Sequence, residues 1–421
     1  SENMPATVVV GMVFGDEGKA KVIDHLASDI VVRYQGGANA GHTIVVGNDR
    51  FVAHQIPSGI LRKGVMNVIG NGMVVDLEML AAEMDDVTKH GGDPERSLMI
   101  SSNAHLVLPW HKDEDKRIEE RLSKEKNAVG TTLKGIGPTY TTKSQRCGIR
   151  AEYLLDDNVL RGALERFALI QGETFDKKAS FEWLTQWRPR VLPLIQDTVR
   201  YVNERLAKGA HILLEGAQGT MLDYDHGTYP FVTSSNCTVG GACTGAGIPP
   251  QAITRVVGIM KAYATRVGSG PFPTEDEGER GQLMRKTGKE FGSTTGRARR
   301  CGEQDLVEAA YAVMVNGITE IALVKLDVLD QMDEIKAAHE YHDPRKDEYT
   351  SAMPLQHVFT RVKPMYTTMK GWRPATVAGV REYENLPEKA RDYVGFIESA
   401  LGRPITMIST SPERDDIIVR S

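Results

Sequence analysis

Cysteine is scarce in this chain of 421 residues. Its four cysteines are Cys147, Cys237, Cys243 and Cys301, and no two of them form a Cys-x-x-Cys pair. Four scattered thiols are too few to stabilise a chain of this length through disulfides. We therefore expect reduced cysteines and a cytoplasmic protein.

Long apolar runs and an excess of basic charge are missing as well. No apolar run comes near the roughly 18 residues that a membrane-spanning helix needs. The 51 Lys and Arg residues face 56 Asp and Glu residues, so no overall positive field exists to hold a nucleic-acid backbone. We expect neither a membrane nor a nucleic acid as partner. The first residues also lack a secretory signal pattern, and we interpret residues 1–3, which precede Met4, as a cloning remnant.

The remaining composition is that of a large globular protein, with 41% hydrophobic and 25% charged residues. Short β-branched segments end in glycine-rich turns, which is typical of an α/β sheet with functional loops. We expect an α/β fold with a large, mostly parallel central sheet, flanking helices and insertions, and a phosphate-loop-like nucleotide-binding core. The sequence has no internal repeat, low-complexity tract or clear linker, so residues 1–421 are expected to form a single elaborated domain.

Hydrophobic periodicity assigns individual elements. Strands are predicted at residues 6–11, 30–35, 65–69, 212–215, 256–261, 321–325 and 405–409. Helices are predicted at residues 77–90 after Asp76 as N-cap, at 110–126, 304–315 and 387–401, and from about Lys19 to Ala27.

The segment from Gly11 to Lys19 joins the first strand to a helix through a glycine-bearing loop. Backbone N–H groups there, with the Lys19 ammonium, can hold phosphate oxygens. The match to the usual phosphate loop is incomplete, because Val13 replaces its first glycine and Ala20 replaces the Ser or Thr that holds magnesium. Phosphate binding and a plain strand-to-helix turn are both open. Asp16 favours function, since a carboxylate in such a loop repels phosphate unless it binds a metal or acts as a base.

Three further segments carry groups suited to anions or protons. His42 closes the glycine-rich residues 36–42 and can act as a general acid or be an ordinary bonded polar residue. Residues 130–138 precede Lys143, Arg146 and Arg150, which suits phosphate anchoring or a solvated charged face. Residues 292–300 contain three arginines, which suit carboxylate capture or a basic surface loop.

Two clusters allow more specific hypotheses. Asp223, Asp225 and His226 are metal-ligand types, but they lack clear ligand spacing. Asp327, at the end of a predicted strand, can accept the ring N–H and amino group of guanine while Lys325 covers the ring, although a Lys-x-Asp triplet is common.

Taken in order, these segments resemble the adenylosuccinate synthetase family from about Val8 to Arg414. The phrases that carry the resemblance are Gly-Asp-Glu-Gly-Lys at 15–19, Gln-Gly-Gly at 35–37, Asn-Ala-Gly-His-Thr at 39–43, Ile-Pro-Ser-Gly at 56–59, Glu-Gly-Ala-Gln-Gly-Thr at 215–220, Thr-Ser-Ser-Asn at 233–236, Lys-Leu-Asp-Val-Leu-Asp at 325–330 and Ser-Thr at 409–410. Their joint occurrence in this order is very specific.

The resemblance implies a ligase that joins L-aspartate to IMP with GTP. It implies a 6-phosphoryl-IMP intermediate and the products adenylosuccinate, GDP and phosphate, as a step of AMP biosynthesis. Asp16 would remove the N1 proton of the purine and His42 would stabilise the transferring phosphoryl group, with Lys19 and Gln218 as further catalytic residues. Mg²⁺ would be held by Asp16 and the Gly41 carbonyl.

The resemblance also implies three binding sets and a homodimer in which Arg146 crosses the interface. The substrate nucleotide would be bound by Asn39, Thr132, Arg146, Gln218, Leu222, Thr233, Val267, Gly268 and Arg297. Aspartate would be bound by Thr294, Thr295, Arg297 and Arg299. GTP would be bound by Gly15, Glu17, Gly18, Lys19, Lys325, Asp327, Ser409, Ser411 and Pro412.

Five positions depart from the family pattern: Phe14, Ala20, Ala38, Glu303 and Ser411. Ser411 leaves GTP or ATP open as the donor, because a side chain stands where backbone would approach the base. Viral relatives that ligate aspartate to dGMP, to make a 2-aminoadenine nucleotide precursor, remain an alternative. A non-catalytic nucleotide-binding switch is an alternative of another class. It requires neither the base Asp16 nor the acid His42.

Overall fold

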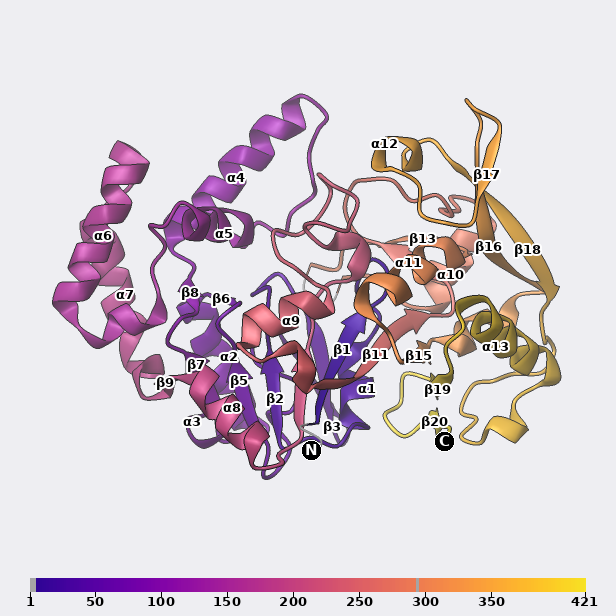
Figure 1. Ribbon diagram of the computed structural model, residues 1–421, viewed down its shortest axis with the longest axis horizontal. Coiled ribbons are helices and arrows are strands. Elements are labelled where there is room, and N and C mark those ends of the chain that lie inside the picture. The colour runs from indigo at the N-terminus through magenta and orange to yellow at the C-terminus, as the bar shows by residue number, and fades with distance from the viewer. Residues whose placement is uncertain (1–4, 293–294) are drawn as a thin grey trace. The chain divides into compact units, whose positions relative to one another are not determined.

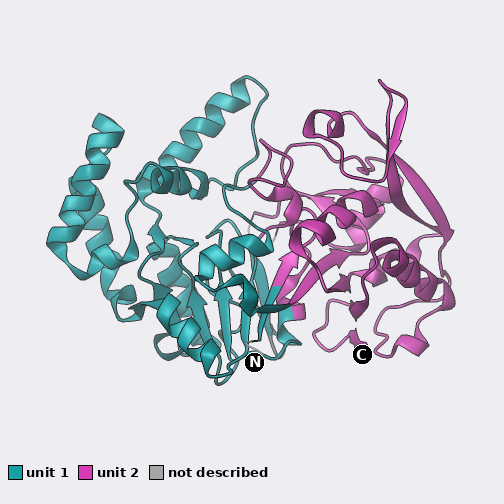
Figure 2. Cartoon of the chain, in the orientation of Figure 1, with its two compact units in different colours: residues 1–8, 23–217, 233–254 teal, residues 9–22, 218–232, 255–421 magenta. Residues whose placement is uncertain are grey.

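The computed structural model describes residues 5–292 and 295–421. The chain forms two compact units, unit 1 with residues 1–8, 23–217 and 233–254, and unit 2 with residues 9–22, 218–232 and 255–421 (Figure 2). It passes from one unit to the other after residues 8, 22, 217, 232 and 254, so neither unit is a continuous stretch of sequence.

A ten-stranded sheet has the order β20-β19-β15-β11-β1-β10-β2-β5-β7-β9 (Figure 1). The register of six neighbouring pairs is parallel, and β19 pairs with β20 antiparallel. This confirms the predicted fold class. The strands are β1 (Ala6–Gly11), β2 (Ile30–Arg33), β5 (Met66–Ile69), β7 (Leu98–Ser101), β9 (Ile195–Gln196), β10 (Ile212–Glu215), β11 (Ile253–Lys261), β15 (Glu320–Val324), β19 (Ile405–Ser409) and β20 (Ile417–Val419).

Unit 1 contains most of the helices. They are α2 (Leu77–Lys89), α3 (Pro94–Ser97), α4 (Pro109–Lys124), α5 (Ile136–Ser144), η1 (Ala151–Leu155), α6 (Asp157–Gln171), η2 (Gly172–Thr174), α7 (Lys177–Val191), η3 (Leu192–Leu194), α8 (Thr198–Ala207), α9 (Val239–Ala246) and η5 (Pro250–Ala252). Two small pairs are β3 (His42–Val46) with β4 (Asp49–Ala53), and β6 (Val74–Val75) with β8 (His105–Leu106).

Unit 2 carries a second, smaller sheet of β14 (Gln304–Asp305), β16 (Glu334–Asp343), β17 (Glu348–Thr350) and β18 (Lys363–Lys370). Strand β12 (Ala264–Arg266) pairs with β13 (Arg300–Gly302). The helices of this unit are η4 (Thr220–Leu222), α10 (Glu279–Thr287), α11 (Leu306–Asn316), η6 (Leu326–Gln331), α12 (Gln356–Phe359), η7 (Tyr383–Asn385) and α13 (Glu388–Leu401). Helix α1 (Lys19–Asp24) is divided between the units after Val22.

Capping residues explain where several helices begin. Asp76 accepts from the backbone N–H of Met79 at 3.1 Å, which confirms it as the N-cap of α2. Asp305 caps α11 by accepting from the N–H groups of Val307 and Glu308. The helix predicted from residue 304 therefore begins two residues later, because 304–305 pair with β16.

Other predicted boundaries need small corrections. Helix α1 ends at Asp24 instead of 27, and β2 ends at Arg33 instead of 35. Lys325 lies outside β15 with a φ of 60°, as the N-cap of η6. Helices α6 to α8 and the sheet of β16 to β18 were not predicted.

Each unit has its own hydrophobic core. In unit 1, Leu77 and Leu80 of α2 belong to the same buried cluster as Ile69 and Ile100 from the sheet and Phe167 of α6. In unit 2, the segments around β12, α11 and β16 share a cluster that also contains Phe14. The functional loops described next extend from these cores.

Candidate active site

The loop after β1 packs against residues 218–221 within unit 2. The backbone N–H of Met221 donates to the Val13 carbonyl at 2.8 Å, and Thr220 Oγ1 donates to the Gly11 carbonyl at 3.0 Å. A Cβ at Gly219 would lie 2.5 Å from the Val13 oxygen, so this approach requires glycine. The predicted phosphate loop is thus built from two segments about 200 residues apart.

Glu17 fills the inside of that loop. The residue is only 3% exposed, and its carboxylate accepts from the backbone N–H groups of Gly15 at 3.0 Å and Val13 at 3.3 Å. Lys19 Nζ lies 3.4 Å from Glu17 Oε2 and donates to the Gln218 carbonyl at 2.9 Å. Two of the predicted catalytic residues, Lys19 and Gln218, therefore meet. The Glu17 side chain itself is bonded to the loop backbone.

Asp16 has a left-handed φ of 57° and a side chain that is 35% exposed. Its Oδ2 lies 3.5 Å from Nε of Arg299. The predicted base and a predicted aspartate-binding arginine are thus adjacent within unit 2. A part-exposed carboxylate in this position can accept a proton or bind a hard cation.

Arg299 belongs to the arginine hairpin, which we define by its described residues, 290–292 and 295–299. The Arg299 N–H donates to the Glu290 carbonyl at 3.0 Å, and the Gly292 N–H donates to the Arg297 carbonyl at 2.7 Å. Thr295 and Arg297 are exposed, whereas Thr294 lies outside the described residues.

The turn at residues 409–412 is held by a lysine that the sequence did not single out. Lys21 Nζ donates to Ser409 Oγ at 2.8 Å and to the Ser411 carbonyl at 2.6 Å. Burial lowers the pKa of Lys21 to about 8, while Asp416 opposes that shift. Ser411 Oγ donates to Asp416 Oδ2 at 2.6 Å, so its hydroxyl is bound to its own turn. Pro412 is exposed.

Asp327 is the second residue of η6, the helix that begins directly after Lys325. Burial raises the pKa of Asp327 to about 6; Asp330 adds to the shift, and Lys325 and Lys21 oppose it. The carboxylate can accept two N–H donors only in its ionised form. This predicted guanine-binding group therefore changes charge just below neutral pH.

The remaining predicted residues of unit 2 lie in nearby loops. Leu222 ends η4, and Arg300 Nη1 donates to the carbonyl of Gly268, the residue after Val267, at 3.1 Å. The metal hypothesis for Asp223, Asp225 and His226 was wrong. Asp223 Oδ2 accepts from the backbone N–H groups of the other two residues, and no metal-holding group of His, Cys, Asp or Glu occurs among the described residues.

Unit 1 places His42 in a bonded network at the start of β3. His42 Nδ1 lies 2.9 Å from Glu215 Oε1, and Nε2 lies 2.9 Å from the Ile56 carbonyl. Ser58 donates its N–H to the same Glu215 carboxylate at 2.9 Å, and Oγ also donates to it. Burial alone would raise the pKa of Glu215, but His42, Arg33 and Ser58 hold it at about 2. Glu215 and Ser58 lie in segments that carry the family resemblance, but the sequence predicted no role for either residue.

Other predicted residues of unit 1 are less constrained. Asn39 Oδ1 accepts from the Gly37 N–H at 3.1 Å, and its Nδ2 lies 3.5 Å from Thr233 Oγ1, so these two nucleotide-binding candidates meet. Gly41, Thr132 and Arg146 are exposed. The loop that bears Thr132 is held by the carboxylates of Asp115 and Glu119.

Three residues that depart from the family pattern have defined surroundings. Phe14 packs 5.6 Å from the ring of Phe272 and 4.4 Å from the guanidinium of Arg266. Glu303 forms an ion pair with Arg280. Ala38 is 3% exposed.

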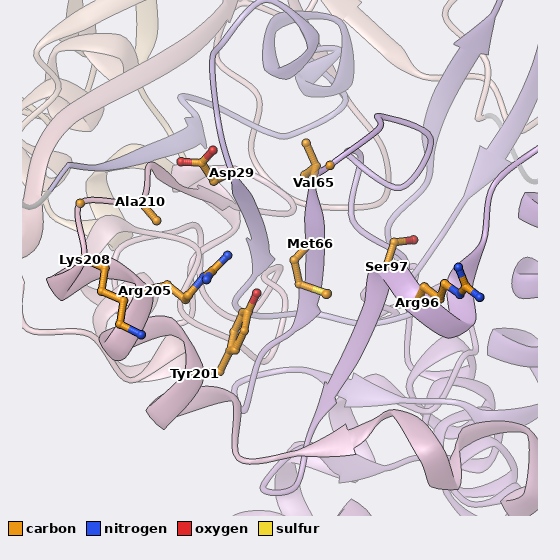
Figure 3. Close-up of a pocket in the computed structure, with 11 residues that line it drawn as sticks. Asp29, Val65, Met66, Arg96, Ser97, Tyr201, Arg205, Lys208 and Ala210 are labelled. Atoms are coloured by element: carbon orange, nitrogen blue, oxygen red, sulfur yellow. The ribbon is translucent and has the colours of Figure 1, made fainter.

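A cavity of about 640 Å³ in unit 1 contains none of the predicted site residues (Figure 3). It lies where β2, β5 and β7 begin, and Asp29, Met66 and Ser97 line it together with Arg205 and Lys208. The last two are at the C-terminal end of α8, where cations offset the helix dipole. Ligands of α/β sheets bind at the opposite, carboxyl ends of the strands, so we do not assign this cavity to the reaction.

Comparison with known proteins identifies the family. The family model for adenylosuccinate synthetase matches residues 8–418. The chain belongs to the adenylosuccinate synthetase family. It is 46% identical over 432 residues to the adenylosuccinate synthetase of Salinibacter ruber, covering 99% of this chain and 98% of that protein. It is 47% identical over 427 residues to that of Chlorobium phaeobacteroides, covering 99% and 97%.

Solved structures agree. The fully ligated adenylosuccinate synthetase of Plasmodium falciparum matches with a TM-score of 0.93 and 36% identity over 99% of each chain. The cyanophage S-2L succinoaminodeoxyadenylate synthetase, which binds dGMP and dATP, matches with a TM-score of 0.65 and 19% identity, covering 99% of this chain and 96% of that one. That second likeness shows the fold alone, and the comparisons favour the ordinary family reaction. As a member of the adenylosuccinate synthetase family, the chain is a GTP-dependent ligase that forms a C–N bond in purine biosynthesis.

No helix within residues 5–292 or 295–421 is long and apolar enough to cross a membrane.

Proposed function

We propose that this chain ligates L-aspartate to IMP, with Asp16 as the base. The observation that carries the proposal is the position of the part-exposed Asp16 carboxylate in the β1 loop, 3.5 Å from Arg299. Arg299 belongs to the arginine hairpin, whose cations suit the two carboxylates of aspartate. A base and an amino-acid anchor side by side fit a reaction that first activates a purine oxygen and then admits an amine.

The chemistry follows in two steps. Asp16 takes the N1 proton of IMP, so that O6 attacks the γ-phosphorus of GTP and GDP leaves. The aspartate amine then attacks C6 and loses a proton, and the phosphorylated O6 leaves as phosphate. Without phosphorylation, O6 would be a poor leaving group. His42 is proposed to stabilise charge on the transferring group, with Lys19 and Gln218 assisting. The products are adenylosuccinate, GDP and phosphate.

Asp16 and the Gly41 carbonyl are proposed to hold Mg²⁺. Both offer hard oxygen donors, the Asp16 side chain is accessible, and Gly41 is exposed. When bound, the ion would supply positive charge that offsets the triphosphate.

The three binding sets carried over from the family are proposed as stated, with IMP at the substrate-nucleotide residues. Arg297 suits a ribose hydroxyl, which IMP has at the 2′ position and dGMP lacks. Asp327 suits guanine as the donor base, and Ser411 does not block it through its hydroxyl, which is bound to Asp416.

One matrix of assays tests these assignments. IMP, GMP and dGMP are each combined with GTP or ATP, with and without aspartate, and the succinylated nucleotide and phosphate are measured. We expect phosphate release only when IMP, GTP and aspartate are all present. Absence of such release at saturating ligands would contradict the ligase reaction, and product from dGMP would favour the viral-type activity.

We further propose a homodimer through the face of unit 1 that bears Arg146. Arg166 of α6 donates to the Arg146 carbonyl at 2.8 Å, which places α6 beside it, and the same helix exposes Leu169 and Ile170. Exposed apolar side chains next to a proposed substrate ligand fit an interface. Sedimentation should give twice the 46.4 kDa chain mass, and Leu169→Glu should shift it toward monomer.

We also propose a cytosolic location, which the free thiols of the four cysteines fit.

A further inference from the structure

Glu290, at the base of the arginine hairpin, has a carboxylate with no solvent exposure and an unusual number of donors. Lys261 Nζ donates to Oε2 at 2.8 Å and Tyr263 Oη donates to Oε1 at 3.1 Å. Arg299 Nη1 lies 3.4 Å from Oε2, and Lys325 Nζ also donates to Oε1. Three cations and one hydroxyl therefore share a single buried carboxylate.

These donors come from segments that are far apart in the sequence. Lys261 ends β11, Arg299 closes the hairpin, and Lys325 follows β15 in a left-handed conformation. Lys325 is fixed a second time, since its Nζ donates to the Gly288 carbonyl at 2.7 Å. Glu290 is thus the group through which the hairpin contacts the Lys325 turn.

The electrostatics make this carboxylate hard to replace. Burial alone would raise the pKa of Glu290, but Lys261, Lys325 and Arg299 together hold it at about 2. Lys261 is itself buried, and burial lowers its pKa. Without the Glu290 charge the three cations would repel one another across a low-dielectric interior. Arg299 and Lys325, which are partly exposed while Lys261 is buried, would turn outward.

We propose that Glu290 is a positioning residue that aligns Arg299 for the amino-acid substrate and Lys325 for the nucleoside triphosphate. It thereby couples two subsites that no single loop connects. The proposal rests on the proposed function for the roles of Arg299 and Lys325. It assigns Glu290 no contact with any substrate.

The test is Glu290→Gln, with the KM of each substrate measured at saturation of the other two. We expect the KM values for aspartate and GTP each to rise about 10- to 100-fold, the range seen when a supporting partner of a binding group is lost. The KM for IMP should change by less than about threefold, because Glu290 contacts no residue proposed for IMP alone. A merely structural defect would raise all three values together.

Glu308→Gln is the matched control. Glu308 is a fully buried carboxyl of the same unit, and burial and the nearby Asp305 both disfavour its charge and raise its pKa. Replacing it with an uncharged amide therefore removes no favourable ion pair comparable to those of Glu290. We expect all three KM values of this variant to match the wild type. Equal effects of both substitutions would overturn the proposal.

Glu290→Asp covers the case in which the amide variant fails to fold. It keeps the charge that the buried cations need, but it is one methylene too short to reach both Arg299 and Lys325. The same two KM values should rise, and wild-type values for both would overturn the proposal. If the wild type shows no IMP- and aspartate-dependent GTP cleavage, the proposed function fails. If it does and the Glu290 variants are unaffected, only this inference fails.

Discussion

At the scale of single residues, side-chain environment separates chemistry from architecture within one short loop. Asp16 and Glu17 are neighbours in the sequence, yet Asp16 is part-exposed beside Arg299 and Glu17 is buried under two backbone N–H groups. Sequence reasoning assigned both to the site and was able to argue a role only for Asp16. In the folded loop, the buried Glu17 side chain holds the loop backbone through these two hydrogen bonds.

Asp16→Asn should keep ligand binding and lose turnover. The amide preserves the shape of the side chain but cannot take the N1 proton, so kcat should fall on the order of 10²- to 10⁴-fold. Initial-rate kinetics and direct binding of IMP and GTP check this. A loss of nucleotide affinity with an unchanged rate would contradict the base role.

The pKa of about 6 at Asp327 predicts a pH-dependent preference for GTP. The ionised form accepts the two guanine N–H groups, so the KM for GTP should rise as the pH falls below 6, about tenfold by pH 5. The KM for IMP should not follow the same curve. Asp327→Asn should raise the KM for GTP at every pH between 5 and 8, and a flat wild-type profile would rule out Asp327 as the guanine acceptor.

At the scale of elements, the β1 loop works because backbone approaches backbone. The Gly219 contact with Val13 explains why a glycine follows Gln218, and only the fold shows that the two segments touch. The same holds for Lys21, whose contacts with the 409–411 turn lie almost 400 residues away in sequence. Local patterns predicted each loop, but not which loops meet.

Gly219→Ala should separate the β1 loop from residues 218–221. A Cβ 2.5 Å from the Val13 oxygen and 2.6 Å from the Gly15 nitrogen requires backbone to move, and we expect kcat/KM to fall more than about tenfold. Gly395→Ala is the control, because nothing lies within 4 Å of its Cβ in α13. That change should leave activity intact and raise the free energy of unfolding by about 0.5–1 kcal/mol. Equal activity of the two variants would exclude a tight loop contact as the reason for Gly219.

At the scale of the whole molecule, the two units are interleaved along the chain. Strand β1 gives residues 6–8 to unit 1 and residues 9–11 to unit 2, and the chain passes between the units at five points. We propose, as the sequence suggested, that residues 1–421 behave as one elaborated domain. Each unit therefore includes part of strand β1.

Thermal unfolding should therefore show one transition. Calorimetry of the ligand-free protein should give a single peak, because β1 is shared and unfolding either unit disrupts this strand. Two resolved transitions, or an early loss of unit 1 signals alone, would show that the units are separate domains.

The sequence by itself determined the local features. The α/β class, the start of α2 at Asp76, the strand-to-loop order and the family phrases from Gly15 to Thr410 can all be read from neighbouring residues. Periodicity and capping depend on contacts within a few residues, which explains why these predictions were accurate to within a few positions.

Only the tertiary structure decided which distant residues share a charge. Glu290, Lys261 and Lys325 lie in different segments. From the sequence, only Lys325 was a candidate site residue, and Glu290 and Lys261 had no predicted role. The same is true of Arg33, which is buried near Glu215 and helps to lower its pKa. Burial and ion pairing are set by long-range packing, and these physical quantities have no local signature in the sequence.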